Sequence, residues 1–253
     1  RDIAASIKAE GARLTIASLN GKSGPGTIQG SGSIDLAAPG LPVDMVFAAS
    51  QARPIVSDLF TATMSGNLAL KGKLEDLLDL SGKLDITRGE INLPENFPPE
   101  VAVLNVRRRG LPPPPPPSTN RIALDVTIAT SGPIFVRGHG VDAVMGGDMR
   151  LSGTTAEPLG GGSFRMVRGE YSLGGQTLQF DSGTVTFDGT GVRRRMDPRL
   201  DFEAHTESGG VTATLSITGY ASAPKIALSS SPSLPQDEIV ARLLKAMAEE
   251  GSA

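Results

Sequence analysis

Short runs of alternating apolar and polar residues, separated by glycine, recur along almost the whole chain of 253 residues. In residues 121–129, isoleucine, leucine and valine occupy every second position. Because successive side chains of a β-strand point to opposite faces, this pattern predicts a strand with one apolar face. The pattern recurs in TIQGSGSIDL, GNLALKG, GKLDITRGEINL, GDMRLSG and TLQFDSGTVTFDG. Many short strands with regular turn signals predict an all-β fold.

Glycine at the breaks predicts tight hairpin turns, because glycine adopts positive φ without steric cost. One internal repeat fits this interpretation, since residues 82–93 match residues 162–173 at an offset of 162 − 82 = 80 residues. We interpret each copy as a hairpin whose turn is the triplet Arg-Gly-Glu, with Gly89 or Gly169 bending the chain between two exposed charges. Repetition predicts that neighbouring units stack into one continuous core.

A proline- and arginine-rich segment interrupts the alternation. Six consecutive prolines, Pro112 to Pro117, favour an extended polyproline helix that cannot enter the interior of a sheet. The segment is therefore predicted to be a solvated insertion. Arginine triplets at 107–109 and 193–195 are predicted to be solvated loop charges, with contact to anionic lipid head groups as the alternative.

The chain is accordingly divided into four parts. The predicted parts are an N-terminal sheet segment 1–94, the insertion 95–120, a C-terminal sheet segment 121–231 and an amphipathic helix 232–250. Ser233 is the predicted N-cap of the helix, which carries one apolar stripe that includes Ile239, Val240 and Leu243.

Composition argues against several function classes. The net charge of −3 argues against a nucleic-acid binder, because such proteins need clustered positive charge. The absence of cysteine rules out disulfides and thiolate metal sites. The two histidines, His139 and His205, stand outside any metal-spaced cluster, and no nucleophile elbow, P-loop or zinc-protease motif is present. We expect no enzyme activity, no cofactor and no metal. The first residue is arginine, which predicts a fragment, and no run approaches the roughly 20 apolar residues of a membrane helix.

A sheet with one apolar face must hide that face, and three arrangements compete. The sheet could pack on a second sheet in a sandwich. It could close into a membrane barrel, although two tyrosines and no tryptophan are too few for the usual aromatic girdles. It could also curl into an open trough whose apolar lining meets lipid.

The chain also resembles a known family through its C-terminal half. The stretches IFVRGHGVDAVMGGDMRLSGTTAEPLGGGSFRMVRGEYSLGGQTLQFDSGTVTFDG and SITGYASAPKIALSSSPSLPQDEIVARLL are similar to the C-terminal region of the TamB family. The resemblance is strong over Ile122 to Leu244 and rests mainly on pattern over Arg1 to Pro94. It implies a long sheet curled into a taco-like open groove, apolar inside, as in bridge-like lipid carriers. It further implies a periplasmic location, with the full-length protein anchored in the inner membrane by a segment outside this chain.

The resemblance implies phospholipid acyl chains as cargo, an outer-membrane TamA-like barrel as partner, and nascent outer-membrane proteins as a further partner. The first hypothesis is therefore lipid carriage between the two membranes, with or without a role in outer-membrane protein assembly. The alternatives are a chaperone-like module that holds nascent β-strands and a ligand-free structural β-solenoid. Alternation selects the candidate groove-lining residues: Ile122, Leu124, Val126, Ile128, Met149, Leu151, Phe164, Met166, Leu178, Phe180, Val185, Phe187, Leu200, Phe202, Val211, Leu215, Ile217, Ile226 and Leu228.

Overall fold

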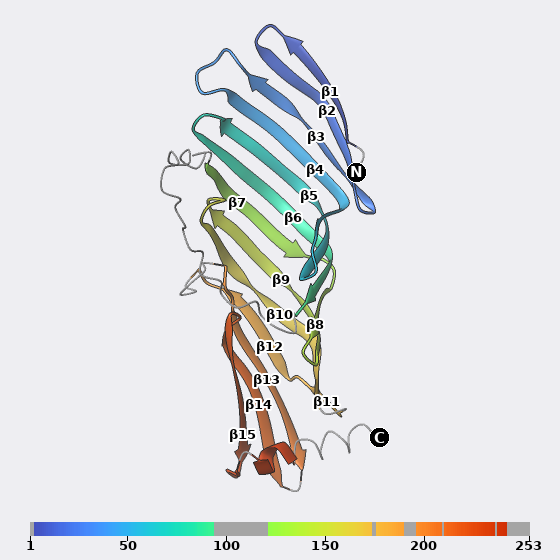
Figure 1. The fold of residues 1–253 in the computed structure, drawn as a ribbon, viewed down its shortest axis with the longest axis vertical. Helices are drawn as coiled ribbons and strands as arrows, with labels where there is room; N and C mark the ends of the chain where they lie inside the picture. Colours follow the sequence, from blue (N-terminus) through green and yellow to red (C-terminus); the bar gives the residue numbers. More distant parts are fainter. Residues whose placement is uncertain are drawn as a thin grey trace, which may run out of the picture.

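The computed structural model describes residues 3–93, 121–173, 176–189, 196–208, 210–235 and 237–241. These residues form one long sheet of fifteen strands that runs from β1 at one end of the molecule to β15 at the other (Figure 1). The strands are β1 Ile3–Glu10, β2 Arg13–Ser23, β3 Gly26–Asp35, β4 Pro42–Val56, β5 Phe60–Lys73, β6 Leu77–Asn92, β7 Arg121–Thr130, β8 Ile134–Gly138, β9 Val141–Gly153, β10 Pro158–Leu173, β11 Gln176–Gln179, β12 Ser182–Phe187, β13 Arg199–Ser208, β14 Val211–Tyr220 and β15 Ala223–Ser231. The prediction of an all-β fold with a curled, open sheet is confirmed.

Most neighbouring strands are antiparallel, and strand order follows chain order apart from β8 and β11, which pair at the side of the main path. The exception is β6, which pairs in parallel with β7 along its first part and with β8 along its last four residues. Gly132 lies between β7 and β8, where a Cβ atom would stand 1.8 Å from the carbonyl oxygen of Thr87. This parallel seam joins the predicted segments 1–94 and 121–231 into one sheet. The predicted insertion 95–120 and the arginine triplet 193–195 lie outside the described residues.

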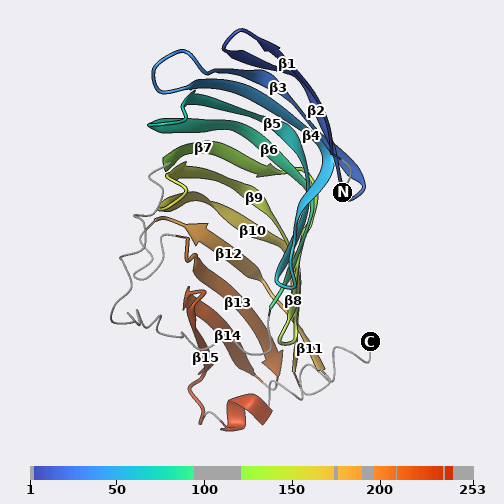
Figure 2. The same cartoon turned by 45° about the horizontal axis from the view of Figure 1, so that its top comes forward.

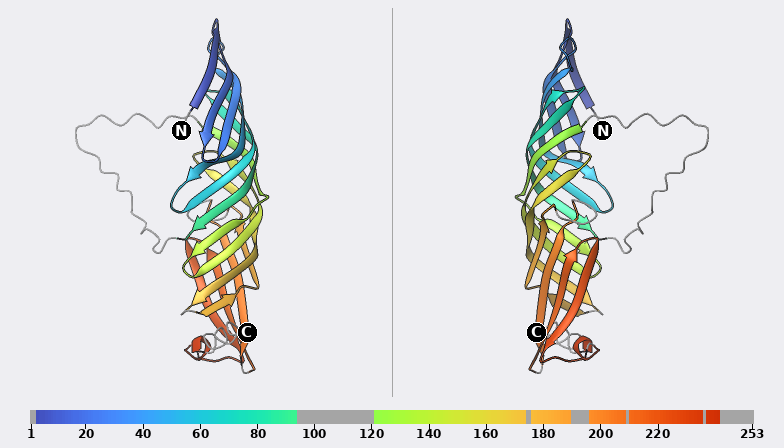
Figure 3. Two further views of the ribbon diagram at one scale, coloured as in Figure 1. Left: turned by 90° about the vertical axis from the view of Figure 1, so that its right-hand side faces the viewer. Right: turned by 90° about the vertical axis from the view of Figure 1, so that its left-hand side faces the viewer.

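The sheet is curled, so that it has a concave and a convex face (Figure 2). Two side views show a long, narrow molecule with strands oblique to the long axis (Figure 3). The register aligns apolar residues across successive strands, as in the row Phe47, Leu68, Gly82 and Val126, which belong to β4, β5, β6 and β7. Because paired residues share a face, these alignments create one continuous apolar surface on the concave side.

The central strands are longer than the alternating runs predict. Gly66 and Gly82, expected at hairpin turns, lie inside β5 and β6, which contain 14 and 16 residues. Their φ angles are 152° and 143°, and a Cβ atom at either position would stand 2.2 Å from a carbonyl oxygen of the neighbouring strand. Glycine here permits a bend and a close approach between strands. The short runs are therefore halves of long, bent strands.

The interpretation of the two Arg-Gly-Glu triplets as hairpin turns is wrong. Both triplets lie within continuous strands, β6 and β10. A register shift precedes each triplet, leaving Thr87 in β6 and Val167 in β10 as the extra residue of a β-bulge. The two bulges are 167 − 87 = 80 residues apart, so the sequence repeat marks a repeated bulge that bends a strand without reversing it.

A short helical turn, residues 237–241, follows β15 at the C-terminal end of the sheet (Figure 2). Its first hydrogen bonds run from the N–H groups of Glu238 and Ile239 to the Pro235 carbonyl, at 3.0 and 3.1 Å. Pro235 therefore occupies the cap position, and the prediction of Ser233 as N-cap was wrong by two residues. Residues 242–250 of the predicted helix 232–250 lie outside the described residues.

Candidate binding cavity on the concave face

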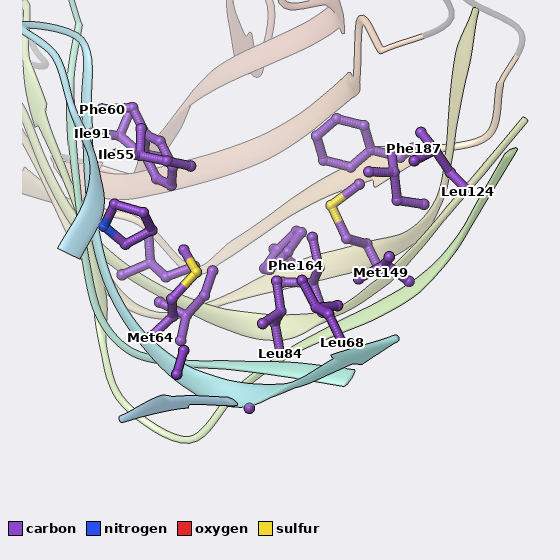
Figure 4. A pocket seen from close by; sticks show the side chains of 18 of the residues that line it. Ile55, Phe60, Met64, Leu68, Leu84, Ile91, Leu124, Met149, Phe164 and Phe187 are labelled. Carbon is purple, nitrogen blue, oxygen red and sulfur yellow. The ribbon is translucent and has the colours of Figure 1, made fainter. Parts of the chain in front are cut away.

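The concave face contains a cavity of about 760 Å³. Every residue that lines it is apolar, glycine or proline. In Figure 4, Phe60, Met64, Leu84 and Phe164 project from the curled sheet towards the same space. The described lining comprises Ile28, Phe47, Ala49, Pro54, Ile55, Phe60, Met64, Gly66, Leu68, Leu80, Leu84, Ile86, Ile91, Leu124, Val126, Ile128, Ile134, Val136, Met145, Met149, Leu151, Phe164, Val185, Phe187 and Pro198.

The bulges keep both halves of a long strand directed at this cavity. In β6, Leu80, Leu84 and Ile86 line the cavity from even-numbered positions, and Ile91 does so from an odd-numbered one. Side chains alternate with period two, so a regular strand would turn Ile91 to the convex face. The extra residue Thr87 shifts the alternation by one position, so that Ile91 points to the concave face. In strand β4 two register shifts cancel each other, so Phe47 and Ile55 stay on one face.

Several lining residues remain half-buried although they lie on the concave face. Leu68, Leu84 and Leu124 belong to three neighbouring strands and all retain solvent contact. A closed core would bury leucine side chains completely, because burial of a leucine contributes about 1.5–3 kcal/mol. The cavity walls are therefore held apart, and the hydrocarbon between them faces an open space.

The register places the nineteen predicted groove residues on this same face, in different surroundings. Eight of them line the cavity: Leu124, Val126, Ile128, Met149, Leu151, Phe164, Val185 and Phe187. A further seven belong to packed clusters nearer the C-terminal end: Met166, Leu178, Phe180, Phe202, Leu215, Ile217 and Leu228. The remaining four are Ile122, Leu200, Val211 and Ile226.

Those four residues differ in their surroundings. Ile122 pairs with the buried Leu78, and Leu200 pairs with the cavity residue Val185. Val211 is buried at the start of β14. Ile226 is 67% exposed on the edge strand β15.

Sequence reasoning missed the cavity wall that β3 to β6 and β8 provide. Phe47, Leu68 and Leu84 could have been found, because VDMVFAAS, GNLALKG and GKLDI alternate as clearly as the segments that were selected. Ile55 could also have been found, because it keeps the odd-numbered alternation of Phe47, whereas Ile91 could not, because a single bulge reverses the alternation before it. The repeated segment that contains this bulge is visible in the sequence, but its residues do not distinguish a bulge from a hairpin turn.

The C-terminal end of the concave face is a packed core. Leu178 and Leu215 are 1% and 4% exposed, and they pack with Ala204 and Ala213. Ile239 of the helical turn joins the same cluster at 4% exposure. The rings of Phe180 and Phe202 meet edge to face with centroids 5.8 Å apart. The apolar face is therefore covered here by the chain itself.

The convex face carries the charges. Lys71 pairs with Asp44 at 3.3 Å and Arg150 with Asp125 at 2.8 Å. Each of these side chains is more than half exposed, so each pair contributes about 0–1 kcal/mol to stability. The chief effect of these charges is that the convex side stays hydrated.

An aromatic ring on the convex face is held between two cations. The guanidinium carbons of Arg88 and Arg137 lie 5.1 and 4.9 Å from the centroid of Phe135. Each arginine also pairs with a carboxylate, Arg88 with Glu90 and Arg137 with Asp142. The arrangement covers the one large aromatic ring that β8 turns outward.

His205 links two parts of the sheet. His205 Nδ1 lies 2.6 Å from Asp181 Oδ2, and the His205 backbone N–H donates to the same carboxylate oxygen at 2.8 Å. This contact ties β13 to the residues between β11 and β12. In the described parts of the chain, no three histidine, cysteine or acidic residues gather closely enough to hold a metal ion.

Across the described residues, no helix has the length and apolar character needed to span a membrane.

Comparison with known proteins identifies the family. Residues 17–252 match the family model described as the TamB C-terminal domain. The translocation and assembly module subunit TamB of Haemophilus influenzae is 24% identical over 206 residues, which is 74% of this chain. The match covers 16% of that relative, so the chain corresponds to about a sixth of its length. Because the family model covers most of the chain, this protein belongs to the TamB family and carries its C-terminal domain.

Proposed function

We propose that this domain holds the acyl chains of phospholipids in its concave cavity and thereby carries lipid between the inner and outer membranes. The observation that carries the proposal is the open cavity of about 760 Å³ with a wholly apolar lining. This volume lies within the range of about 300–1,000 Å³ that is usual for small-molecule sites. Among the described residues, the lining offers no charged or hydrogen-bonding side chain to fix a polar ligand.

Hydrocarbon is the ligand chemistry that this lining favours. Each CH₂ group removed from water contributes about 0.8 kcal/mol, so ten of them contribute about 8 kcal/mol before the costs of immobilising the chain. The contribution depends on buried area and not on direction, which allows a chain to slide along the wall. Such a carrier needs no catalytic group, and we propose that the domain is not an enzyme.

We propose a periplasmic location for the domain in a Gram-negative bacterium, as a part of a longer protein that is anchored in the inner membrane elsewhere. The family membership and the name of the Haemophilus influenzae relative support a role within a translocation and assembly module. An outer-membrane TamA-like protein is the proposed partner at the far end of the route.

The decisive experiment is mass spectrometry of an organic extract of the purified chain against a mock purification. We expect phospholipid in stoichiometric amount from the wild type. Leu68→Arg and Leu124→Arg each place a charge among half-buried lining residues and are expected to remove most of that lipid. Ile226→Arg is the matched control, because Ile226 is exposed and lies outside the cavity lining. A folded, monodisperse wild type without lipid would overturn the proposal.

A second candidate function is a chaperone-like role towards nascent outer-membrane strands. The observation that favours it is the pair of free edges, β1 and β15, which end the pairing order of the described sheet. A strand edge offers unpaired backbone groups to an incoming strand. Crosslinking of a β-signal peptide to β15 that excess phospholipid does not reduce would support this role separately from lipid carriage.

A further inference from the structure

The open cavity and the packed C-terminal core meet at two side chains. Met166 of β10 and Phe202 of β13 pack against both buried clusters, one around Ile86 and Met145 beside the cavity, the other around Leu215. Neither Met166 nor Phe202 lines the cavity, although their neighbours Phe164 and Val185 do. The hydrocarbon surface therefore changes from open to filled at this pair.

Two glycines leave the space that these side chains occupy. A Cβ atom on Gly183 would stand 2.5 Å from the Phe202 ring, and one on Gly169 would stand 2.4 Å from the Met166 sulfur. Both glycines are buried, so the Phe202 ring lies directly against the backbone of the neighbouring strand β12, and the Met166 thioether lies against the backbone of its own strand β10. Phe180 then meets Phe202 edge to face from the other side. The pair is held by close contact on both sides.

In the described residues, no comparable open cavity lies on the C-terminal side of Met166 and Phe202. Leu178, Ala204 and Leu215 are at most 4% exposed, and Ile239 of the helical turn covers them. A methylene chain could enter this region only by displacing side chains that are already in contact. Ala204 and Ala213 contribute to the tight closure, because their small side chains let the neighbouring groups approach closely.

We infer that Met166 and Phe202 form a barrier that ends the hydrocarbon path, so that a bound acyl chain enters and leaves this domain across the open side of the curled sheet and not through its C-terminal end. The inference rests on the proposed function, because it names where the path of that cargo stops. The cavity is then a trough with one closed end.

The absence of tryptophan allows a direct test. Single tryptophans are placed at two concave, half-buried positions, Leu84→Trp in the cavity and Ile217→Trp beyond the barrier. Each variant is mixed with vesicles of phosphatidylcholine whose acyl chains carry bromine, which quenches tryptophan emission on contact. We expect the tryptophan at position 84 to lose most of its emission and the tryptophan at position 217 to keep it.

Removing the barrier should extend the path. In the Ile217→Trp background, Met166→Ala with Phe202→Ala is expected to make the tryptophan at position 217 sensitive to the brominated lipid. The matched control is Met149→Ala with Phe187→Ala, which removes the same two side-chain types from the cavity wall and should leave it insensitive. If the barrier variant fails to fold by circular dichroism, the comparison of the two single-tryptophan proteins still decides.

The outcomes separate the two proposals. Quenching at both positions in the otherwise wild-type chain would overturn the barrier and leave lipid carriage intact. Quenching at position 217 in the Met149→Ala, Phe187→Ala control would also overturn it, since the barrier would then not be the controlling pair. Quenching at neither position would overturn the proposed function, and the barrier with it.

Discussion

The same alternating pattern gives different results in two regions: the cavity region, β3 to β10 with β12, and the C-terminal region, β11 and β13 to β15 with the helical turn. Both have an apolar concave face and a polar convex face. In the first, strands of 13–16 residues such as β4, β5, β6 and β9 hold the walls apart. In the second, strands of 9–10 residues carry small residues, Ala204 and Ala213, and a helical turn covers them. Alternation thus predicts which face is apolar, whereas the elements that cover that face decide whether it is open.

The largest expected effect tests whether in-strand glycines shape the wide region. Gly162→Ala puts a Cβ atom 2.4 Å from the Asp148 carbonyl oxygen at a φ of 139°. We expect a loss of unfolding free energy of about 3 kcal/mol or more, because backbone strain and a backbone clash combine. Urea unfolding measures it. Gly161→Ala is the control one residue away, where a Cβ atom meets nothing within 4 Å and little change is expected. Equal effects at both positions would show that the bend does not depend on Gly162.

The second prediction compares the two regions directly through one substitution type. Leu215→Ala in the packed core should lower the unfolding free energy by about 3 kcal/mol, since it leaves a void among buried side chains. Leu84→Ala in the cavity wall should cost about 1 kcal/mol, because the removed methyl groups already face open space. Thermal unfolding of the lipid-free proteins measures both. Similar losses would mean that the cavity is as tightly filled as the core.

The smallest expected effect concerns the convex face. Arg88→Ala removes an exposed ion pair with Glu90 and one cation against Phe135, and should cost about 0.5–1 kcal/mol. Bound lipid should stay unchanged, since Arg88 does not line the cavity. Lipid analysis beside urea unfolding checks both statements. A loss of lipid in a folded Arg88→Ala protein would show that convex contacts maintain the curl.

The sequence predicts the class of fold and which side chains of each C-terminal strand share a face, because period two is a local property of each strand. The same reasoning misread Gly66 and Gly82 as turns, since a glycine with positive φ looks identical in sequence whether the chain reverses or only bends. It also placed Leu215 and Phe180 in an open groove, although they form a core. Their neighbours come from strands far along the chain and from the helical turn, and alternation carries no information about such contacts.

The parallel seam at β6 has a consequence for how the sheet assembles. Almost all other pairings join strands that follow each other closely in the chain, so each half can grow one hairpin at a time. At the seam Leu77 pairs with Arg121, across 121 − 77 = 44 residues, and a longer loop must close before the contacts form. We expect pulsed hydrogen exchange to show amides in the β6–β7 pairing gaining protection after those of β4–β5 and β13–β14. During synthesis from the amino end, the strands up to β6 would then form one half of the sheet, with β6 as an unpaired edge. The second half would join this edge only after β7 and β8 have been synthesised.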